Sequence, residues 1–391
     1  MVTIIENDYL TIMKIGIVCY PTYGGSGVVA TEIGMGLAEL GHQIHFISYK
    51  RPARLISFHE NIYHHEVTPV DYPLFEYTPY ESALTSKIVD VVKYSNLDIL
   101  HVHYAIPHAI VAYLAKSILQ SEGINIPIIT TLHGSDITLV GKDKTFSPVV
   151  TFSINQSDGV TAVSEHLRNE TLNNFDITKE IKVIYNFIDF KRFHWTNKNH
   201  FKKMFAPENE KIMVHISNFR KVKRASDVVK VFKEVHDRLP SKLLMIGDGP
   251  ERPNIERMCR EVGLCHEIRF LGKQDAISEI LAISDVFVLP SANESFGLAA
   301  LEAMACKVPV ISTNIGGIPE VNIEGVTGFL SDVGDIEDMA RNTLKILENP
   351  ELHESFRNNA YLRAKQFDLK KVLPIYENYY LEIIENYKIS I

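Results

Sequence analysis

The sequence is poor in the residues and patterns that mark several large classes of protein. Its 391 residues include only four cysteines, and no two of them form a C-x-x-C pair. This spacing indicates neither a disulfide framework nor a zinc site. The formal net charge is −8. Because nucleic-acid binding depends on a surplus of cations that displace counterions, this charge argues against a nucleic-acid partner.

Long apolar runs and paired aspartates are also missing. No run approaches the ~20 residues of a membrane span, and the first residues lack the basic start and cleavage site of a secretory signal. We therefore expect a cytoplasmic protein with no membrane partner. No D-x-D pair occurs anywhere in the chain. Its absence argues against an enzyme that holds a nucleotide sugar through a carboxylate-bound divalent cation.

The sequence does contain a long alternation of apolar strands and amphipathic helices, which predicts parallel α/β sheets. The length favours two domains, and a polar stretch at 186–199 marks the linker. We predict an extension (1–12), a first doubly wound domain (13–195) and a second (196–372). A final helix, about 373–391, is expected to return to the first domain. Ligands of such sheets bind at the carboxyl ends of the strands, so the two domains are expected to face each other across one cleft.

The stretch Val288–Ala305 combines a strand, a small polar turn and a helix that we expect to begin near Ser295 or Phe296. Free N–H groups and the positive end of the helix dipole would then lie at the edge of the sheet, where they can hold a phosphate. Glu294 and Glu302 bracket this point. The alternative is an ordinary capped helix with an acidic first turn.

A glycine-rich segment follows the first strand. Gly25-Ser26-Gly27-Val-Val-Ala fits the G-x-G-x-x-A pattern of dinucleotide-binding folds, but the glycines lie four or more residues past the strand, and the second strand does not end on an acid. A flexible substrate loop ranks first, a plain tight turn second, and a dinucleotide site, with NADP not excluded, third.

Histidines and a tyrosine mark two further strand ends. His101 and His103 share one face of a strand, and without a third ligand nearby a metal pair is disfavoured. We expect one of them to pack in the core and the other to reach the cleft. Tyr104 follows and is a candidate acceptor contact. His133 comes just after the strand 127–132, at the expected cleft edge; the alternative is a histidine that caps the next helix.

The densest basic cluster, Ser217–Arg224, follows the first strand of the second domain. It contains Arg220 and Lys223, and cations at the start of a helix favour a bound anion there. Gly247 begins the turn Gly-Asp-Gly-Pro after the next strand. A glycine there lets the backbone approach a ligand closely at the expected cleft.

Together these motifs resemble the retaining glycosyltransferases of family 4. The resemblance covers residues 14 to about 380 and rests on E-x7-E (Glu294, Glu302) in its Pro-Ser…Glu-Ser-Phe-Gly setting, on Lys223, and on Phe270–Gly272 and Ile315–Glu320. It implies the two-domain GT-B fold. Several segments are most similar to the members that transfer N-acetylglucosamine to L-malate at the start of bacillithiol synthesis. The implied partners are UDP-N-acetylglucosamine and L-malate, with retained α configuration, no metal or cofactor, and a homodimer as an expectation.

The resemblance also implies roles for individual residues. His133 and Glu294 would contact the donor sugar, Glu302 the ribose, and Lys223 with Arg220 the pyrophosphate. The family usually has an arginine five residues before the lysine; here that position is Asn218, so either Arg220 takes over or another residue helps Lys223. Further implied contacts are backbone N–H groups toward the distal phosphate (Ser295, Phe296, Gly297, Leu298), a loop that closes over phosphate and acceptor (Gly24, Gly25, Gly27), and acceptor contacts (Ser26, Tyr104).

Some alternatives stay open. The acceptor carboxylates need cations, and the sequence does not choose among Lys50, Arg51, Lys142 and Lys144. The same fold could serve another small acceptor, or an epimerase or hydrolase. Two alternative hypotheses from other functional classes are a non-catalytic UDP-sugar sensor and an NADP-binding protein.

Overall fold

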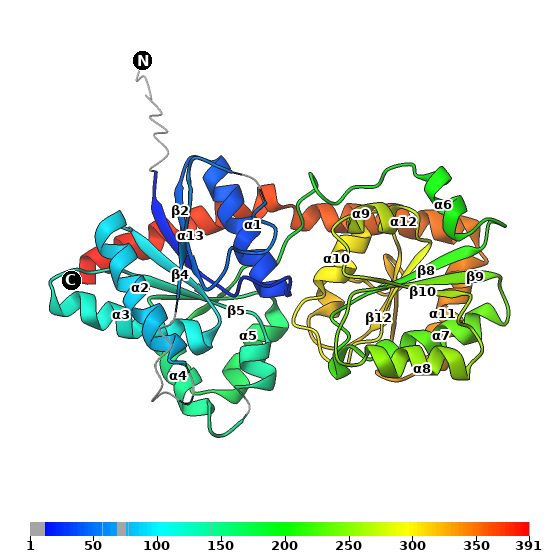
Figure 1. Ribbon diagram of the computed structural model, residues 1–391, viewed down its shortest axis with the longest axis horizontal. Coiled ribbons are helices and arrows are strands. Elements are labelled where there is room, and N and C mark those ends of the chain that lie inside the picture. The colour runs from blue at the N-terminus through cyan, green and yellow to red at the C-terminus, as the bar shows by residue number, and fades with distance from the viewer. Residues whose placement is uncertain (1–11, 57, 69–75, 77, 142, 391) are drawn as a thin grey trace, which may run out of the picture. The chain divides into compact units, whose positions relative to one another are not determined.

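The computed structural model describes residues 12–56, 58–68, 76, 78–141 and 143–390. These residues form two compact units, each a β-sheet with helices packed on it (Figure 1). The first unit contains the described residues up to 161, then 171–182 and 373–390. The second contains 162–170 and 183–372. Residues 183–195, which the sequence analysis placed in the first domain, therefore group with the second unit.

The first unit is built on a seven-stranded sheet of order β3-β2-β1-β4-β5-β6-β7. Neighbouring strands from β3 to β5 pair in parallel. The order reverses between β1 and β4, the switch point at which such folds bind ligands. The strands are β1 (Lys14–Val18), β2 (Gln43–Ser48), β3 (Ile62–Glu66), β4 (Ile99–His103), β5 (Ile128–Leu132), β6 (Gly159–Ala162) and β7 (Ile181–Val183).

Helices connect these strands. They are α1 (Gly25–Glu39), α2 (Tyr80–Ser95), η1 (Ala105–Ala109), α3 (Ile110–Ser121), η2 (Ser135–Leu139), α4 (Ser147–Asn155) and α5 (Glu165–Asn174). Helix α1 begins at Gly25, so Gly25, Ser26 and Gly27 form its first turn. A Cβ atom at Gly27 would lie 2.4 Å from the carbonyl oxygens of Tyr20 and Thr22. Glycine is needed there because the helix start lies directly against the segment that follows β1.

The second unit repeats this plan with a six-stranded, fully parallel sheet of order β10-β9-β8-β11-β12-β13. Its strands are β8 (Lys211–Ile216), β9 (Ser241–Ile246), β10 (Ile268–Gly272), β11 (Val286–Leu289), β12 (Val310–Thr313) and β13 (Gly328–Ser331). Both sheets have the strand order of a Rossmann fold. The prediction of two doubly wound α/β units is confirmed.

The helices of the second unit cover this sheet. They are α6 (Asn199–Phe205), η3 (Lys221–Lys223), α7 (Ala225–His236), α8 (Arg252–Glu261), α9 (Ile277–Ala282), α10 (Leu298–Ala305), η4 (Ile318–Glu320), α11 (Ile336–Leu347), α12 (Pro350–Ala364) and η5 (Lys365–Phe367). The apolar faces of α7 and α11 pack on β8, β9 and β11 to form a fully buried core. This packing fixes the strand ends that carry the basic and acidic motifs.

Two strands lack the long apolar run that predicts a buried strand. Strand β3 reads Ile-Tyr-His-His-Glu at the edge of its sheet, and its residues stay partly exposed, so it lacks a hydrophobic run. Strand β13 is only four residues long. Among the described residues, no helix is both long enough and apolar enough to cross a bilayer.

The last helix, α13 (Leu369–Ser390), packs into the first unit from residue 373 onward. Tyr376 and Tyr380 are almost completely buried. The Tyr380 hydroxyl lies 2.7 Å from His101 Nδ1 on β4, and the Tyr379 hydroxyl accepts a hydrogen bond from the Val160 N–H at 3.1 Å. Because these contacts bury polar atoms in a helix–sheet interface, α13 is an integral part of the first unit.

Replacing Tyr380 with phenylalanine tests the docking of α13. The variant leaves the buried His101 Nδ1 unpaired, so we expect the free energy of unfolding of the first unit to fall by about 1–3 kcal/mol. Urea unfolding followed by circular dichroism measures this loss. Tyr94→Phe is the matched control, because Tyr94 is 81% exposed. Equal stabilities of the two variants would contradict a stabilising role for the Tyr380–His101 contact.

Candidate functional site

Three predicted motifs of the second unit follow three adjacent strands. Lys223 lies in η3 after β8, the turn Gly247–Pro250 follows β9, and Glu294 follows β11. These strands are neighbours in the order β9-β8-β11 and are parallel. Their carboxyl ends therefore meet at one edge of the sheet, and the motifs lie together there.

An ion pair joins two of these motifs. Lys223 Nζ lies 2.6 Å from Glu294 Oε1, and both side chains are mostly buried, with exposures of 22% and 13%. The Ser291 hydroxyl donates to the same carboxylate oxygen at 3.0 Å. The Ala292 N–H donates to the Val222 carbonyl at 2.8 Å and so fastens the two loops to each other. The edge thus presents a cation and an anion in fixed positions.

Helix α10 starts at Leu298, so the prediction that it begins at Ser295 or Phe296 is wrong. Gly297 has φ +97°, a left-handed conformation that interrupts the backbone just before the helix. The N–H groups of the first turn of α10 still lie just beyond the carboxyl end of β11. Phe296 is 2% exposed, and its ring packs against Tyr185 and Phe367. Its side chain is therefore not available to a ligand.

Glycines bring the neighbouring loops against this segment. A Cβ atom at Gly316 would lie 2.0 Å from the Glu294 carbonyl oxygen, and the Gly317 N–H donates to the same oxygen at 2.9 Å. A Cβ atom at Gly247, where φ is +117°, would lie 1.8 Å from the Ser217 carbonyl oxygen. Close backbone packing therefore holds the loops after β8, β9, β11 and β12 in place.

The basic cluster divides into different environments. Lys223 joins the ion pair, whereas Arg224 pairs with Asp227 at 2.5 Å at the start of α7. Arg220 is exposed, and its side chain makes no hydrogen bond or ion pair with any described residue. Its proposed role at a phosphate stays a prediction. Glu302 lies in α10 and is half-buried near Cys306, the pKa of whose thiol is raised by burial and by the Glu302 charge.

His215 on β8 is a residue that the sequence analysis missed. Its Nδ1 donates to the Val288 carbonyl of β11 at 2.8 Å, and its Nε2 accepts from the Ser217 hydroxyl at 2.8 Å. Burial lowers the pKa of His215 to about 4. A neutral ring with these partners ties β8 to β11 near the ion pair. A lone histidine inside an apolar strand was the only sequence feature that could have indicated it.

The predicted residues of the first unit follow β1, β4 and β5, which are neighbours in the sheet. Gly25, Ser26 and Gly27 open α1, so they are helical and do not form the flexible loop that we expected. Ser26 is 7% exposed. Tyr104, with φ +95°, directly follows β4, and its hydroxyl accepts from the Ser135 hydroxyl at 3.1 Å.

His133 follows β5 and is 9% exposed. It does not cap the next helix, because Gly134 occupies the N-cap position of η2. The N–H groups of His133 and Gly134 instead donate to the buried Asp136 carboxylate. Burial raises the pKa of this carboxyl, and backbone hydrogen bonds oppose the rise. Of the basic residues considered for the acceptor, Arg51 donates to the Ile56 carbonyl at 3.3 Å, and Lys142 lies outside the described residues.

Four histidines lie behind this edge: His101, His103, His108 and His133. His101 Nε2 lies 2.6 Å from Thr131 Oγ1, and His103 Nδ1 lies 2.8 Å from His133 Nε2. His101 and His103 are both fully buried, so the expectation that one of them reaches the cleft is wrong. Burial lowers the pKa of His101 and of His133 to about 3 and that of His108 to about 4, and it also lowers the pKa of His103. The described residues contain no group of three or more side chains placed to hold a metal ion.

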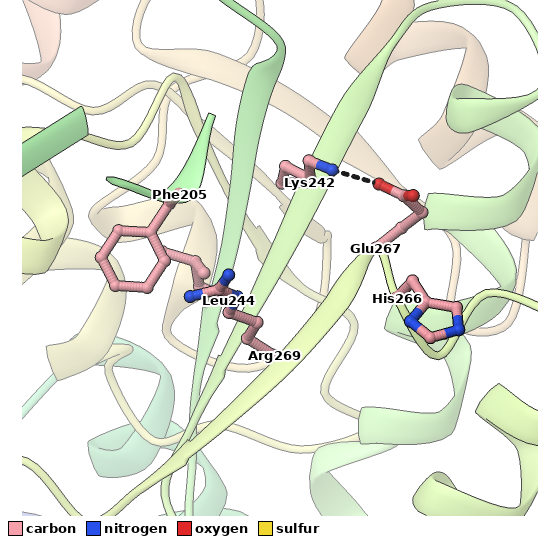
Figure 2. Close-up of a pocket in the computed structure, with 6 residues that line it drawn as sticks. All are labelled: Phe205, Lys242, Leu244, His266, Glu267 and Arg269. Atoms are coloured by element: carbon pink, nitrogen blue, oxygen red, sulfur yellow. Dashed lines mark hydrogen bonds and ion pairs between the residues drawn. The ribbon is translucent and has the colours of Figure 1, made fainter. Parts of the chain in front are cut away.

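A cavity at the opposite edge of the second unit carries none of the predicted residues. Figure 2 shows its lining, which comes from the end of α6 and from the beginnings of β9 and β10. Lys242 Nζ points toward Glu267 Oε2, 2.6 Å away. This cavity lies near the amino ends of the strands, so the strand-end loops remain the candidate site.

Comparisons with known proteins agree with this assignment. Residues 196–363 match the family model "Glycosyl transferases group 1", and residues 23–192 match "Glycosyltransferase Family 4". An N-acetyl-alpha-D-glucosaminyl L-malate synthase from Bacillus anthracis is 49% identical over 381 residues. That similarity covers 96% of the present chain and 98% of the relative.

Solved structures share the fold. A structure of Anabaena HepE in complex with UDP and glucose superposes with a TM-score of 0.80 at 21% identity, covering 94% of this chain and 98% of that one. Sucrose-phosphate synthase from Thermosynechococcus elongatus gives 0.80 at 19% identity, covering 96% and 100%. At these identities the likeness concerns the fold alone.

The buried histidines predict a pH dependence of stability. Their pKa values in the folded protein lie below the value near 6.5 of an unfolded histidine. At a pH between the folded and unfolded pKa values, the unfolded chain therefore binds more protons than the folded protein. The stability that the neutral, buried rings contribute is therefore complete above pH 6.5 and is lost as the pH falls toward 4. In this range the free energy of unfolding changes by at most about 1.4 kcal/mol per pH unit for each histidine. Urea unfolding at pH 7.5, 6 and 5 measures this pH dependence. The variant His108→Asn should lose the part of the dependence that comes from His108. Equal stabilities at pH 7.5 and 5 would contradict burial of neutral rings.

Proposed function

The chain belongs to glycosyltransferase family 4, and we propose that this glycosyltransferase moves N-acetylglucosamine from UDP-N-acetylglucosamine to the hydroxyl of L-malate. The product would keep the α configuration and begin bacillithiol synthesis. The proposal is supported by the Bacillus anthracis relative, whose name states the sugar and malate and whose similarity covers nearly both whole chains. The free thiols of the four cysteines, three of them buried, fit a cytoplasmic location.

The observation that carries the proposal is the Lys223–Glu294 pair beside the start of α10. A nucleotide diphosphate needs positive charge and N–H donors, and Lys223 and the helix start offer both. Arg220 and the N–H groups of Ser295–Leu298 would add further donors. Glu294 would accept hydrogen bonds from hydroxyls of the donor sugar, and Glu302 from the ribose hydroxyls.

The proposed reaction needs charge stabilisation and positioning. The bond between the sugar C1 and the diphosphate oxygen breaks, and the malate hydroxyl oxygen bonds to C1 on the same face. The hydroxyl proton passes to the released phosphate oxygen, so no side-chain base is required. Lys223 stabilises the negative charge that grows on the leaving UDP, and a donor in such a position is typically worth about 3–4 kcal/mol of barrier. With these groups in place we propose that the reaction needs no metal or cofactor.

We assign the acceptor to the strand ends of the first unit. Ser26 and Tyr104 offer hydroxyl groups, and the first turn of α1 offers backbone N–H groups at Gly25 and Gly27. The positive end of a helix dipole favours a carboxylate, which suits one end of the malate dianion. His133, which directly follows the adjacent strand β5, lies at the same edge and would contact the donor sugar.

Two substitutions separate the donor-binding roles. Glu302→Ala should weaken UDP binding by roughly tenfold with a smaller effect on kcat, because a charged hydrogen bond to the ribose contributes equally to bound substrate and transition state. Lys223→Ala should lower kcat by about 10²–10³-fold, because its charge acts most strongly on the leaving phosphate. Isothermal titration with UDP and steady-state kinetics measure the two effects.

Lys221→Ala is the matched control for Lys223, since it is an exposed lysine of the same cluster. It should change neither quantity by more than about twofold, because exposed charges contribute little. If the Glu302 and Lys223 variants lowered binding and turnover to the same degree, the assigned division of roles would be wrong.

An acceptor panel tests the reaction itself. UDP release from UDP-N-acetylglucosamine is measured without acceptor and with L-malate, D-malate, lactate and glycolate. We expect L-malate to accelerate release at least tenfold over lactate and glycolate, because they lack the second carboxylate that the site would pair. We expect the same preference over D-malate, because its hydroxyl has the opposite configuration and is misplaced when both carboxylates are bound. Release that ignores malate would indicate a hydrolase, and a faster reaction with another hydroxy acid would indicate a different acceptor.

A further inference from the structure

A hydrogen bond between two buried histidines links the candidate acceptor edge to the interior of the first unit. His103 is completely buried at the end of β4, and its Nδ1 lies 2.8 Å from Nε2 of His133. The two rings stack with centroids 5.1 Å apart. His133 Nε2 is thus occupied, and within the described residues its Nδ1 makes no hydrogen bond. Nδ1 is therefore the ring nitrogen that His133 has left for a ligand.

This bond leaves only two arrangements of protons. Burial keeps both rings neutral near pH 7, so each carries a single N–H. If His103 Nδ1 donates, His103 Nε2 is bare and His133 carries its proton on Nδ1. If His133 Nε2 donates, His103 carries its proton on Nε2 and His133 Nδ1 is bare. The state of His103 Nε2 therefore decides what His133 offers to a ligand.

His103 Nε2 is buried and has no hydrogen-bond partner among the described residues. An N–H in that position would be an orphaned donor, which is rarer in proteins than an under-satisfied acceptor. His108 provides a precedent in the same cluster. Its Nδ1 must donate to the His103 carbonyl oxygen at 2.5 Å, so its own buried Nε2 is a bare nitrogen without a partner. The histidine cluster therefore already contains one buried ring nitrogen, His108 Nε2, that has neither a proton nor a partner within the described part of the chain.

We propose that His103 is a positioning residue that fixes His133 in the Nδ1–H tautomer, so that His133 donates a hydrogen bond to a substrate oxygen. The proposal deepens the proposed function and rests on it for the identity of the substrate. It also restricts the chemistry of His133. A ring with Nδ1 protonated and Nε2 hydrogen-bonded has no free lone pair, so His133 cannot take the proton of the acceptor hydroxyl.

Nitrogen NMR of the full chain reads this tautomer directly. The protein is labelled with ¹⁵N-histidine, and long-range ¹H–¹⁵N correlations are recorded at pH 7.5 without ligand. Comparison with His133→Asn identifies the His133 ring. We expect a protonated Nδ1 and an unprotonated, hydrogen-bonded Nε2. A His133 ring protonated on Nε2 would overturn the proposal whatever the activity of the enzyme.

Two variants of His103, whose new side chains have the same shape as each other, test how His103 acts on His133. In His103→Asn the amide N–H₂ can still donate to His133 Nε2, whereas in His103→Asp the ionised carboxylate can only accept. We expect H103N to keep kcat within about threefold and to preserve the tautomer. We expect H103D to move the His133 proton to Nε2 and to lower kcat by at least about tenfold, a smaller loss than the roughly 10²–10³-fold of a donor lost at the developing charge itself.

Equal losses in the two variants, with the His133 tautomer unchanged, would leave His103 a purely structural role and overturn the proposal. Urea unfolding followed by circular dichroism serves as the control for folding of each variant, because His103 lies in the first unit. UDP titration checks that the second unit, which carries the proposed UDP contacts, is intact. His101→Asn is the control for core damage, because the His101 ring packs against His103 with centroids 4.3 Å apart and its nitrogens bond to Tyr380 and Thr131. This variant should lower stability and leave the His133 tautomer unchanged. If the tautomer is as expected but malate is not glycosylated, the proposed function fails and the assignment of His103 stands.

Discussion

The proposed donor site depends on the ion pair between Lys223 and Glu294. A lysine side chain is flexible and strongly hydrated, so its charge is held in one place only by a partner. The carboxylate of Glu294 supplies that partner, and partial burial strengthens the attraction by excluding water. In the proposed reaction a phosphate oxygen replaces the carboxylate beside Lys223, and Glu294 becomes available to the sugar hydroxyls. The pair therefore prepares both charges for one ligand.

Much of this donor edge could be predicted from the sequence, because its residues are close in the chain or follow regular elements. The strand, turn and helix around Glu294 and Glu302 place both carboxylates near the end of a strand, and the parallel sheet brings Lys223 to the same edge. The start of α10 was misplaced because Gly297 adopts a left-handed conformation that a sequence pattern does not specify. Arg220 is exposed and has no side-chain partner among the described residues, so its role is still a prediction.

The interior of the first unit could not be predicted in the same way. The four clustered histidines come from β4, from η1 and from the residue after β5, and the contact of His101 with Tyr380 joins residues 279 positions apart. Spacing suggested that one of His101 and His103 would face a ligand, yet both are buried. Burial, hydrogen-bond partners and the resulting proton positions are tertiary properties. They determine what His133 can offer, and they require the structure.

Carbon NMR of the reaction tests the central claim most directly. The enzyme is mixed with UDP-N-acetylglucosamine labelled with ¹³C at C1 of the sugar, together with unlabelled L-malate, and the anomeric carbon is followed with time. We predict a single new signal, that of an α-glycoside of malate, which grows as the donor signal disappears. A β-glycoside, or free N-acetylglucosamine as the only product, would contradict the assignment of a retaining transferase in which the leaving phosphate accepts the proton.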